Sequence, residues 1–285
     1  MDRLATKYLK PRKALSTACA GCGLGQVHKK ILLAIEQLGI ADGDLVWGAG
    51  IGCTGRQIFN TWKGDNFAGT HGRVYALATG LRLALPPEKK ILLTVGDGDA
   101  FGIGLLHLLH CARRNADLTV IVADNFGYQS TGGQYAWTTP DGAVTDSSPH
   151  GMQDPNWMQN GRDILDMLRA AGAGFLARYT SVEGRNAVSG IRQAIEHRGF
   201  SLVHIIYPCV THFFSKAPGI RQPADAHRWL RDRTNPSPSA EFPASELTFK
   251  TGIFHRAGHD TTPEFGEQLR AFTKKIREGG GHDTR

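Results

Sequence analysis

Short apolar runs alternate along this chain with longer segments in which apolar residues recur every three or four positions. The short runs are typical of buried strands, and the longer segments are typical of amphipathic helices. The predicted strands span residues 45–47, 91–95, 118–123, 174–179 and 201–207. The predicted helices span residues 24–38, 72–85, 102–114, 163–171 and 182–197. This alternation predicts an α/β fold with a doubly wound, mainly parallel sheet covered by helices on both faces.

Two stretches depart from the alternation. Residues 126–161 are rich in Gly, Thr, Ser, Pro and Gln without a clear period, and a loop of that length within a compact domain is usually functional. After Pro218 the composition shifts to Pro, Arg and Ser, so we expect an extended segment over 218–245 and a final helix over 263–276. The expected organisation is a basic arm with a CxxC loop at 1–22, one α/β domain at 23–217 and an extended C-terminal tail at 218–285.

Composition limits the classes of function. The 285 residues are 41% hydrophobic and 21% charged, as in an ordinary globular protein, and no apolar run is long enough to cross a membrane. The net charge of +7 permits an acidic partner, but no aromatic–basic pattern of a nucleic-acid reader is present. Basic residues within 3–13 form either a solvated arm or a docking surface for an acidic electron carrier. No apolar signal core follows them, which predicts a cytoplasmic protein.

One motif after the predicted strand 91–95 is typical of a phosphate site. Gly96 and Gly98 allow the backbone to turn tightly and to approach a phosphate. The helix expected from Gly102 would direct its first N–H groups toward that phosphate. Asp97 and Asn125 follow neighbouring strands, and their oxygens are ligands that suit Mg²⁺. The sequence therefore predicts a magnesium diphosphate site.

The glycine run 48–52 suggests an alternative, a dinucleotide-binding loop. The run lacks the G-x-G-x-x-G spacing because Cys53 takes the last position. The segment Thr54-Gly55-Arg56 also does not begin an apolar-periodic helix. We therefore favour the diphosphate site over a nicotinamide site.

Cysteine usage is a second signal. An odd number of cysteines, five, without an export signal argues against a disulfide framework and for metal or redox use. Cys19 and Cys22 form a CxxC motif, whereas Cys53 and Cys209 each follow a predicted strand, so three loops can meet at one edge of the sheet. Four thiolates suit zinc or an iron–sulfur cluster, and spacing alone favours zinc. Cys111 lies within a predicted helix and is expected to be a buried core thiol.

Longer stretches around these motifs resemble the beta subunit of 2-oxoacid:ferredoxin oxidoreductases. The similarity covers about residues 8–218 and is carried by CAGCG, GIGCTGR, THGR, GDGDAFGIGLLHLLHCARRNADL, DNFGYQSTGGQ and YPC. The resemblance implies a thiamine diphosphate-binding domain, and it favours a 4Fe–4S cluster over zinc at Cys19, Cys22, Cys53 and Cys209. It implies cofactor contacts from Ile51, Gly52, Cys53, His71, Gly96, Asp97, Gly98, Asp99, Asn125, Gly127 and Thr131. The Gly127 carbonyl would complete the magnesium shell begun by Asp97 and Asn125.

The activity implied by the resemblance is the reversible, coenzyme A-dependent oxidative decarboxylation of a 2-oxoacid, with electrons passing through the cluster to ferredoxin. Thiamine enzymes also use a glutamate on a separate pyrimidine-binding domain, and this chain has only one α/β domain. In two-subunit members of the family that domain lies on the alpha subunit. The expected assembly is therefore a heterodimer or a dimer of heterodimers.

Arg56 bears on the choice of substrate. Family members often carry a lysine at this position near the substrate carboxylate, whereas an arginine can clamp a carboxylate with two parallel hydrogen bonds. We expect Arg56 to act in catalysis and 2-oxoglutarate to be the substrate. Pyruvate and branched-chain or aryl 2-oxoacids stay open. So do two other classes of protein, a non-redox thiamine-dependent decarboxylase half-subunit and a zinc-stabilised nucleic-acid-binding protein.

Overall fold

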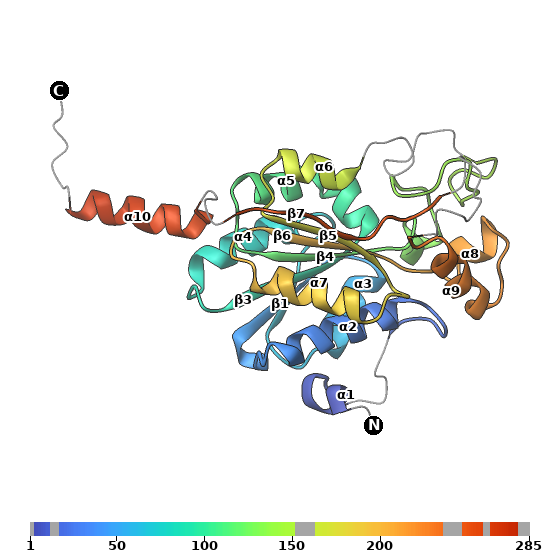
Figure 1. The fold of residues 1–285 in the computed structure, drawn as a ribbon, viewed down its shortest axis with the longest axis horizontal. Helices are drawn as coiled ribbons and strands as arrows, with labels where there is room; N and C mark the ends of the chain where they lie inside the picture. The colour runs from blue at the N-terminus through green and yellow to red at the C-terminus, as the bar shows by residue number, and fades with distance from the viewer. Residues whose placement is uncertain (1–2, 12–16, 152–162, 236–246, 259–262, 279–285) are drawn as a thin grey trace.

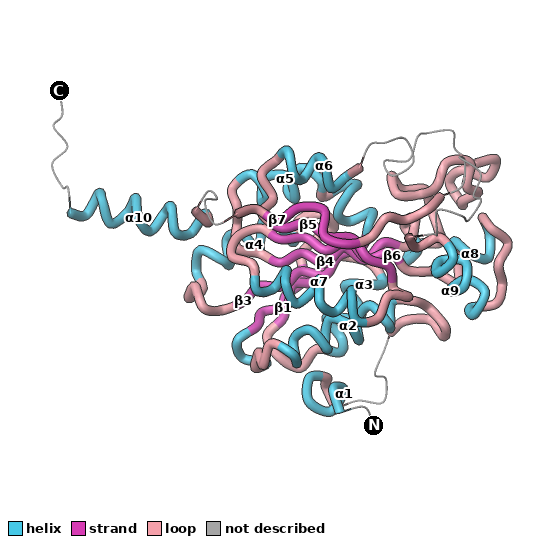
Figure 2. The backbone as a smooth tube through the Cα atoms, in the orientation of Figure 1, coloured by secondary structure: helices cyan, strands magenta, loops and turns pink. Residues whose placement is uncertain are grey.

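A twisted sheet runs through the centre of the chain (Figures 1 and 2). The computed structural model describes residues 3–11, 17–151, 163–235, 247–258 and 263–278. The sheet has seven strands in these residues, in the order β2-β1-β3-β4-β6-β5-β7, and every neighbouring pair is parallel except β5 and β7. The strands are β1 (Leu45–Ala49), β2 (Asn66–Ala68), β3 (Lys90–Gly96), β4 (Thr119–Asp124), β5 (Phe175–Thr180), β6 (Ser201–Ile206) and β7 (Gly252–Arg256). The predicted parallel, doubly wound sheet is confirmed.

Helices cover both faces of this sheet and bury one apolar cluster on each. The first layer contains α1 (Arg3–Tyr8), α2 (Leu24–Gln37), α3 (Cys53–Thr61) and α7 (Arg185–Glu196). The second contains α4 (Val74–Ala84), α5 (Leu105–Arg113) and α6 (Ile164–Ala170). Helices pack on a sheet in this way when one side of the helix is apolar. In helix α2, for example, Val27, Ile31 and Ile35 recur at helical spacing and are fully buried.

The order of the strands fixes where a ligand can bind. From β1 the chain crosses to β2 at one edge of the sheet, and it then returns past β1 to β3. The loops after β1 and β3 therefore diverge and leave a crevice between them at the carboxyl edge. Open parallel sheets bind their ligands at such a switch point.

Three predictions near this crevice need correction. Residues 53–61 form helix α3, although the sequence showed no apolar period there. The buried face of α3 includes the polar residues Thr54, Gln57 and Thr61, which conceals the pattern. The predicted helix at 102–114 corresponds to α5 (Leu105–Arg113), which starts three residues later, because a π-helical segment (Gly98–Ile103) with a kink at Gly102 precedes it. Strand β2 was not predicted because it has only three residues.

The C-terminal part is less extended than its composition suggested. Within the segment expected to be extended, residues 223–232 form α9 (Pro223–Asp232), a helix that the sequence did not indicate because it begins with proline. A short helix, α8 (Phe213–Lys216), precedes that segment. Strand β7 then pairs antiparallel with β5 and becomes an edge of the sheet. The expected final helix is α10 (Phe265–Glu278), which projects from the body (Figure 1).

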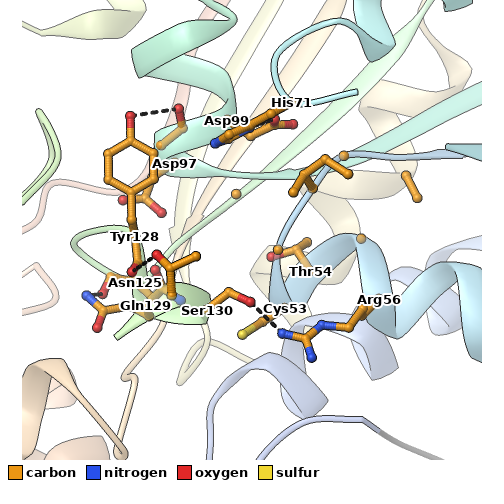
Figure 3. A pocket seen from close by; sticks show the side chains of 18 of the residues that line it. Cys53, Thr54, Arg56, His71, Asp97, Asp99, Asn125, Tyr128, Gln129 and Ser130 are labelled. Carbon is orange, nitrogen blue, oxygen red and sulfur yellow. Dashed lines mark hydrogen bonds and ion pairs between the residues drawn. The ribbon is translucent and has the colours of Figure 1, made fainter. Parts of the chain in front are cut away.

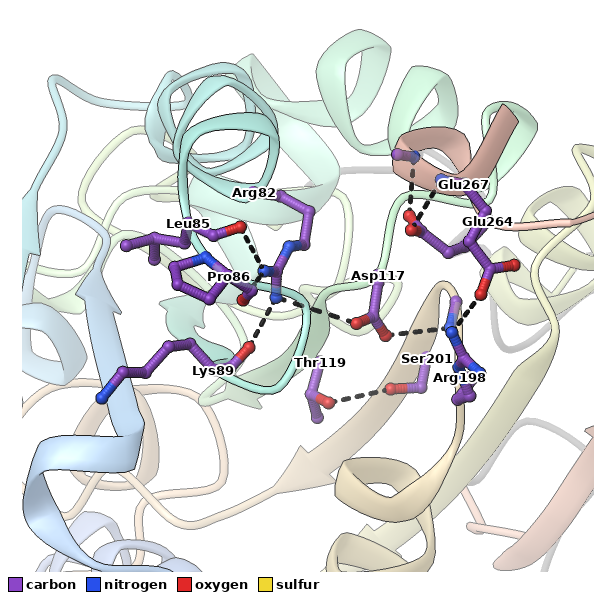
Figure 4. Close-up of polar contacts among 12 residues, drawn as sticks. Arg82, Leu85, Pro86, Lys89, Asp117, Thr119, Arg198, Ser201, Glu264 and Glu267 are labelled. Carbon is purple, nitrogen blue, oxygen red and sulfur yellow. Dashed lines mark hydrogen bonds and ion pairs between the residues drawn. The ribbon is translucent and has the colours of Figure 1, made fainter. Parts of the chain in front are cut away.

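Polar contacts tie the amino edge of the sheet together (Figure 4). Arg82 donates to the carbonyl oxygen of Leu85 at 3.0 Å and to that of Lys89 at 2.5 Å, which closes the end of α4. Glu264 accepts from the amides of Gly266 (2.7 Å) and Glu267 (2.8 Å), where α10 begins. The charged groups of Arg82 and Glu264 therefore stabilise helix ends at this edge of the sheet.

The described residues of the basic arm pack on the body. Helix α1 buries Leu4, Ala5 and Tyr8 against the first layer, and Lys7 forms an ion pair with Glu36 of α2 at 2.5 Å. The described part of the arm is therefore a packed helix, and residues 12–16 lie outside the described residues. In the described chain no helix has the length and apolar character needed to cross a membrane.

Candidate functional site

A cavity of about 410 Å³ opens at the carboxyl edge, in the crevice between β1 and β3 (Figure 3). Its walls come from the loop and helix start after β1, the turn at His71, the motif after β3 and the loop after β4. All eleven residues predicted to contact the cofactor line it, and so does Arg56. The fold thus brings together, in one cavity, residues that the sequence spreads over about 80 positions.

An oxygen cluster, formed by Asp97 Oδ1, Asn125 Oδ1 and the Gly127 carbonyl oxygen, lies in this cavity. Asn125 Nδ2 donates to the Tyr207 hydroxyl at 2.7 Å. Asn125 Oδ1 then faces Asp97 Oδ1 at 3.1 Å and the Gly127 oxygen at 3.0 Å. Neighbouring ligands of an octahedral Mg²⁺ ion, with bonds of 2.0–2.1 Å, lie about 2.8–3.0 Å apart. Both separations from Asn125 Oδ1 therefore suit neighbouring positions in such a shell.

The orientation of the Asn125 amide decides whether the three groups bond to one another or form a site for a cation. With Nδ2 turned inward, the amide would donate to Asp97 and to Gly127, and the three groups would satisfy one another. With Oδ1 inward, three acceptors meet with no hydrogen between them, an arrangement that a bound cation stabilises. Both orientations keep the 2.7 Å contact with Tyr207, whose hydroxyl donates to Oδ1 in the first and accepts from Nδ2 in the second. Without a cation the first orientation satisfies more groups, and a bound Mg²⁺ would select the second.

The rest of the structure holds Asp97 in place. Its Oδ2 accepts from the Gly127 amide at 2.8 Å and from the Thr138 hydroxyl, which leaves Oδ1 for the oxygen cluster. Burial, and then the neighbouring charge of Asp124, raise the pKa of Asp97 well above its usual range. A divalent cation at the cluster would offset this cost of a buried carboxylate.

The turn that presents Asn125 and Gly127 is strained. Phe126, although not glycine, has φ +66°, and Gly127 has φ +150°. A side chain at Gly127 would place a Cβ 2.6 Å from the Gln134 carbonyl oxygen. Asp124 Oδ1 accepts from the Phe126 amide at 2.9 Å and steadies the turn. Strain of this kind is common where a binding geometry is held in advance.

Behind this turn, a buried polar chain runs toward α6. His204 Nε2 pairs with Asp124 Oδ2 at 2.8 Å, and Arg178 Nε donates to His204 Nδ1 at 3.0 Å. The ring proton must therefore be on Nε2, which donates to Asp124. Arg178 also makes two 2.6 Å hydrogen bonds to Asp163, the residue that caps α6. Burial raises the pKa of Asp124 to about 7 and lowers that of His204 well below its usual range.

On the opposite wall, Asp99 joins two segments of the cavity. Its Oδ1 accepts from the Gly72 amide at 2.6 Å and contacts His71 Nδ1. A side chain at Gly50 would meet Asp99 Oδ2 at 2.2 Å, so glycine is needed there. Burial raises the pKa of Asp99, and the bond from His71 opposes this shift. Asp99 thus orients the His71 turn as well as lining the cavity.

Arg56 lies at the cavity mouth in the first turn of α3. Its Nη2 donates to the Ser130 hydroxyl, and its side chain is exposed. Helix α3 can begin there because Gly52 has φ +116°, and because a Cβ at Gly55 would lie 1.7 Å from the Gly50 carbonyl oxygen. The Arg56 guanidinium therefore connects helix α3 to the loop after β4 across the mouth of the cavity.

The thiol region, formed by Cys19, Cys22, Cys53 and Cys209, lies beside the cavity. The Gly23 amide donates to the Pro208 carbonyl oxygen at 3.1 Å and brings the CxxC loop to the end of β6. Burial, and to a lesser extent the nearby thiols Cys209, Cys19 and Cys53, raise the pKa of the Cys22 thiol to about 12. Cys53 lines the cavity as well, so it belongs to both regions.

The four thiols share one region without closing on a point. Across the described chain, no three His, Cys, Asp or Glu side chains are gathered as around a single metal ion. Four sulfurs around one zinc ion would lie about 3.8 Å apart. The predicted buried thiol, Cys111, is elsewhere, 3% exposed in the second layer and 3.3 Å from the Thr79 hydroxyl.

Several residues of this site were not predicted. Tyr207 is fully buried, bonds to Asn125 and lies close enough to Cys22, Cys53 and Cys209 for them to raise its pKa, after the larger effect of burial. Its position directly before Pro208-Cys209 at a strand end was a usable signal. Thr138 and Ser130 carried none, because they lie in a loop without a period and act only through tertiary contacts.

Comparisons with known proteins agree with this geometry. A family model described as the C-terminal thiamine pyrophosphate-binding domain of thiamine pyrophosphate enzymes matches residues 50–205. The 2-oxoglutarate synthase subunit KorB of Methanocaldococcus jannaschii is 34% identical over 96% of this chain and 98% of its own length. The KorB subunit of Archaeoglobus fulgidus is 35% identical over 95% of each chain.

The chain is a beta subunit of the 2-oxoacid:ferredoxin oxidoreductase family.

A solved member of this family supports the fold. The structure of 2-oxoglutarate:ferredoxin oxidoreductase from Magnetococcus marinus, with 2-oxoglutarate, coenzyme A and succinyl-CoA bound, matches with a TM-score of 0.79 and 26% identity. The match covers all of this chain and 94% of that one. Family membership confirms the resemblance and the thiamine diphosphate-binding domain. It favours the oxidoreductase over the non-redox decarboxylase and the zinc-stabilised nucleic-acid-binding protein.

Proposed function

We propose that this beta subunit binds magnesium thiamine diphosphate in the cavity and a 4Fe–4S cluster in the thiol region. With its alpha subunit it converts 2-oxoglutarate and coenzyme A to succinyl-CoA and CO₂, and ferredoxin takes the electrons. The observation that carries the cofactor assignment is the oxygen cluster. With Oδ1 turned inward, Asn125 lies 3.1 Å from Asp97 Oδ1 and 3.0 Å from the Gly127 oxygen, on a strained turn beside a buried carboxylate, and this spacing fits Mg²⁺ bound to a diphosphate.

The residues of the cavity bind and orient. Asp97, Asn125 and the Gly127 carbonyl hold the magnesium ion, and Gly96 and Gly98 keep the adjacent wall free of side chains. A Cβ on Gly98 would meet the ring of Tyr128 at 2.3 Å, so the backbone can pack this closely only with glycine. Bound thiamine diphosphate supplies the carbanion chemistry that releases CO₂ from a 2-oxoacid.

The four cysteines fit a cluster better than a single ion. They are shared by three loops, and Cys22, Cys53 and Cys209 lie close enough to Tyr207 to raise its pKa. Within the described residues they are not gathered around a point. Cys53 lies at the boundary with the cavity, which would place a cluster next to the cofactor. A short distance between the cluster and the cofactor would favour electron transfer between them, because the rate of electron transfer falls steeply with distance.

The cavity is incomplete in this chain and therefore needs the alpha subunit. Asp97 and Asp99 are acidic residues of its lining, but no glutamate of the described residues lines it. Beside Arg56, its rim carries two exposed apolar side chains, Ile51 at 47% and Phe59 at 49% exposure. Exposed apolar side chains of this kind are typical of a surface that a partner covers. The alpha subunit would supply the missing glutamate and close the cavity in a heterodimer or a dimer of heterodimers.

The substrate follows from Arg56 and from the relatives. The two KorB relatives carry 2-oxoglutarate in their names, and the solved structure holds 2-oxoglutarate. Arg56 offers two parallel donors at the mouth of the cavity, where it now bonds to Ser130. A second carboxylate on the substrate would suit this cation.

The test is an anaerobic assay of the co-expressed alpha–beta complex with coenzyme A and methyl viologen. We expect dye reduction and succinyl-CoA formation with 2-oxoglutarate, and at least about a tenfold lower kcat/KM with pyruvate or 2-oxobutyrate. Preference for a monocarboxylic 2-oxoacid would contradict the substrate assignment. A complex that releases CO₂ without reducing the dye would contradict the redox assignment.

A further inference from the structure

A groove between α2 and α7, away from the cofactor cavity, has a distinct chemistry. Its volume is about 780 Å³. The lining, called here the basic groove, consists of Gln26, Lys29, Lys30, Leu33, Gln37, Gly184, Arg185, Val188, Ser189 and Arg192. It contains four cationic side chains and, in the part of the chain described, no aspartate or glutamate. Leu33 and Val188 add apolar surface between the charges.

The basic groove begins next to the thiol region. Helix α2 starts at Leu24, two residues after Cys22, so Gln26 lies about one helical turn from that thiol. Lys30 Nζ donates to the Ser181 carbonyl oxygen at 2.7 Å and ties α2 to the loop before α7. Both helices begin at the carboxyl edge and lie side by side (Figure 1). Their N-terminal dipoles add positive potential at the thiol end of the groove.

The rival basic surface, the N-terminal arm, is less suited to a partner. Lys7 pairs with Glu36 at 2.5 Å, and Arg3 lies 3.7 Å from the same carboxylate. Lys10 donates to the Phe59 carbonyl oxygen at 3.0 Å. These cations hold α1 and its following residues on the body. In the groove, Arg185 is exposed at the start of α7. Arg192, two turns further along, forms an ion pair with Glu196 at 3.2 Å, but this pair is on the helix surface and ties no separate segment to the body.

We propose that the basic groove is the docking surface for ferredoxin, an acidic protein that carries one electron. The proposal rests on the cluster assigned under the proposed function. In each encounter one electron passes from the reduced cluster of this chain to the oxidised cluster of ferredoxin, and no bond forms or breaks. The cations attract the acidic carrier, and the position of the groove beside Cys22 shortens the path of the electron.

The test compares two electron acceptors with the co-expressed alpha–beta complex. Methyl viologen is a small cation that needs no docking surface, whereas an acidic 4Fe–4S ferredoxin does. The variants are Arg185→Glu and Arg185→Glu/Arg192→Glu. Arg113→Glu, an exposed cation on α5 in the opposite layer, makes the same charge change and serves as the matched control.

We expect the double variant to raise the KM for ferredoxin about 10- to 100-fold at low salt. The rate with viologen and the rate of Arg113→Glu with ferredoxin should stay within about twofold of wild type. Salt should slow the wild type more than the variant, because screening removes an attraction that the variant has lost. Arg185→Gln/Arg192→Gln gives a milder test should the charge reversal impair folding.

Three outcomes would overturn the proposal. The KM for ferredoxin could be unchanged in the folded variants, or it could rise equally in Arg113→Glu. Loss of the alpha subunit from the double variant in size-exclusion chromatography would assign the groove to subunit assembly instead. A wild-type complex that fails to reduce viologen contradicts the proposed function itself, and thus separates its failure from that of the docking surface.

Discussion

The oxygen cluster and the thiol region lie side by side at one edge of the sheet. They differ in how closely their geometry and protonation state already match those needed to bind a ligand. Asp97, Asn125 and Gly127 come from the ends of two adjacent strands, and the inward end of the Asn125 amide lies 3.0–3.1 Å from Asp97 Oδ1 and the Gly127 oxygen. The cysteines come from three separate loops and do not close on a point. Burial raises the pKa of Cys22 to about 12, so its thiol is protonated at neutral pH.

This difference between the two regions indicates how each of them would bind its ligand. The oxygen cluster needs only to exchange water for magnesium and diphosphate, because the neighbouring strands already set its geometry. The thiol region must lose protons before it can ligate iron, so binding there is coupled to deprotonation of its cysteines. We therefore expect substitutions in the oxygen cluster to act on affinity, and substitutions in the thiol region to act on assembly.

The largest effect is expected from Asp97→Ala, which removes the carboxylate from the oxygen cluster. Loss of groups that merely support metal ligands costs 10- to 100-fold in affinity, so loss of a direct ligand should cost on the order of 100-fold or more. Isothermal titration of thiamine diphosphate into the complex, with and without Mg²⁺, measures this. Asp117→Ala, at the amino edge, is the matched control. Unchanged, magnesium-dependent binding in Asp97→Ala would show that the ion is held elsewhere.

Arg56→Ala tests the substrate side of the same cavity. A hydrogen bond to a charged group contributes about 1.5–3 kcal/mol, which corresponds to roughly 10- to 150-fold in kcat/KM. The loss should be larger for 2-oxoglutarate than for 2-oxobutyrate, because Arg56 is expected to bind the second carboxylate. An equal loss for both substrates would place Arg56 on the carboxylate that they share. Thiamine diphosphate content should not change.

Tyr207→Phe probes the boundary between the two regions. The hydroxyl holds Asn125 at 2.7 Å, so its loss should free the amide and weaken magnesium-dependent binding about tenfold. Iron content should be retained, because the phenyl ring still fills the space near the cysteines. Loss of iron with normal cofactor binding would reverse the role that we assign to Tyr207.

A smaller effect is expected from Asp163→Asn, at the far end of the polar chain behind Asp124. Burial raises the pKa of Asp163, but its bonds to Arg178 outweigh this and hold the pKa below its usual value. The stabilisation is therefore present above pH 4 or so and is lost as the pH falls through the pKa of the folded state. At pH 7 we expect the variant to melt several degrees lower than wild type. In thermal scans the two curves should converge toward pH 3, and a constant gap would exclude the charge as the cause.

The sequence predicted well that Asp97 and Asn125 lie together, because each of them directly follows a strand that the apolar pattern indicates. Asp97 and Asn125 end adjacent parallel strands, so the alternation of strands and helices alone places them together. The resemblance added Gly127, and the cavity contains every residue predicted to contact the cofactor. The buried thiol of Cys111 was evident from its place in an apolar helix.

What the sequence could not show depends on tertiary contacts. Helix α3 was missed because its buried face is largely polar, with Gln57 bonded to His28 at 2.9 Å. Helix α9 was missed because Pro223 begins it, in a segment whose composition is typical of extended chain. The basic groove joins residues about 155 positions apart on α2 and α7, and no local pattern links them.

The central claim is that one subunit holds two separate sites, a magnesium diphosphate site and a four-cysteine cluster. The most direct test is to measure iron, sulfide and thiamine diphosphate in anaerobically purified complexes of wild type, Asp97→Ala, Cys209→Ser and Cys111→Ser. We predict about four iron atoms, four sulfides and one cofactor per beta subunit in wild type and in Cys111→Ser. Asp97→Ala should lose only the cofactor, and Cys209→Ser should lose only the cluster. Full iron in Cys209→Ser, or zinc in place of iron in the wild type, would contradict the account.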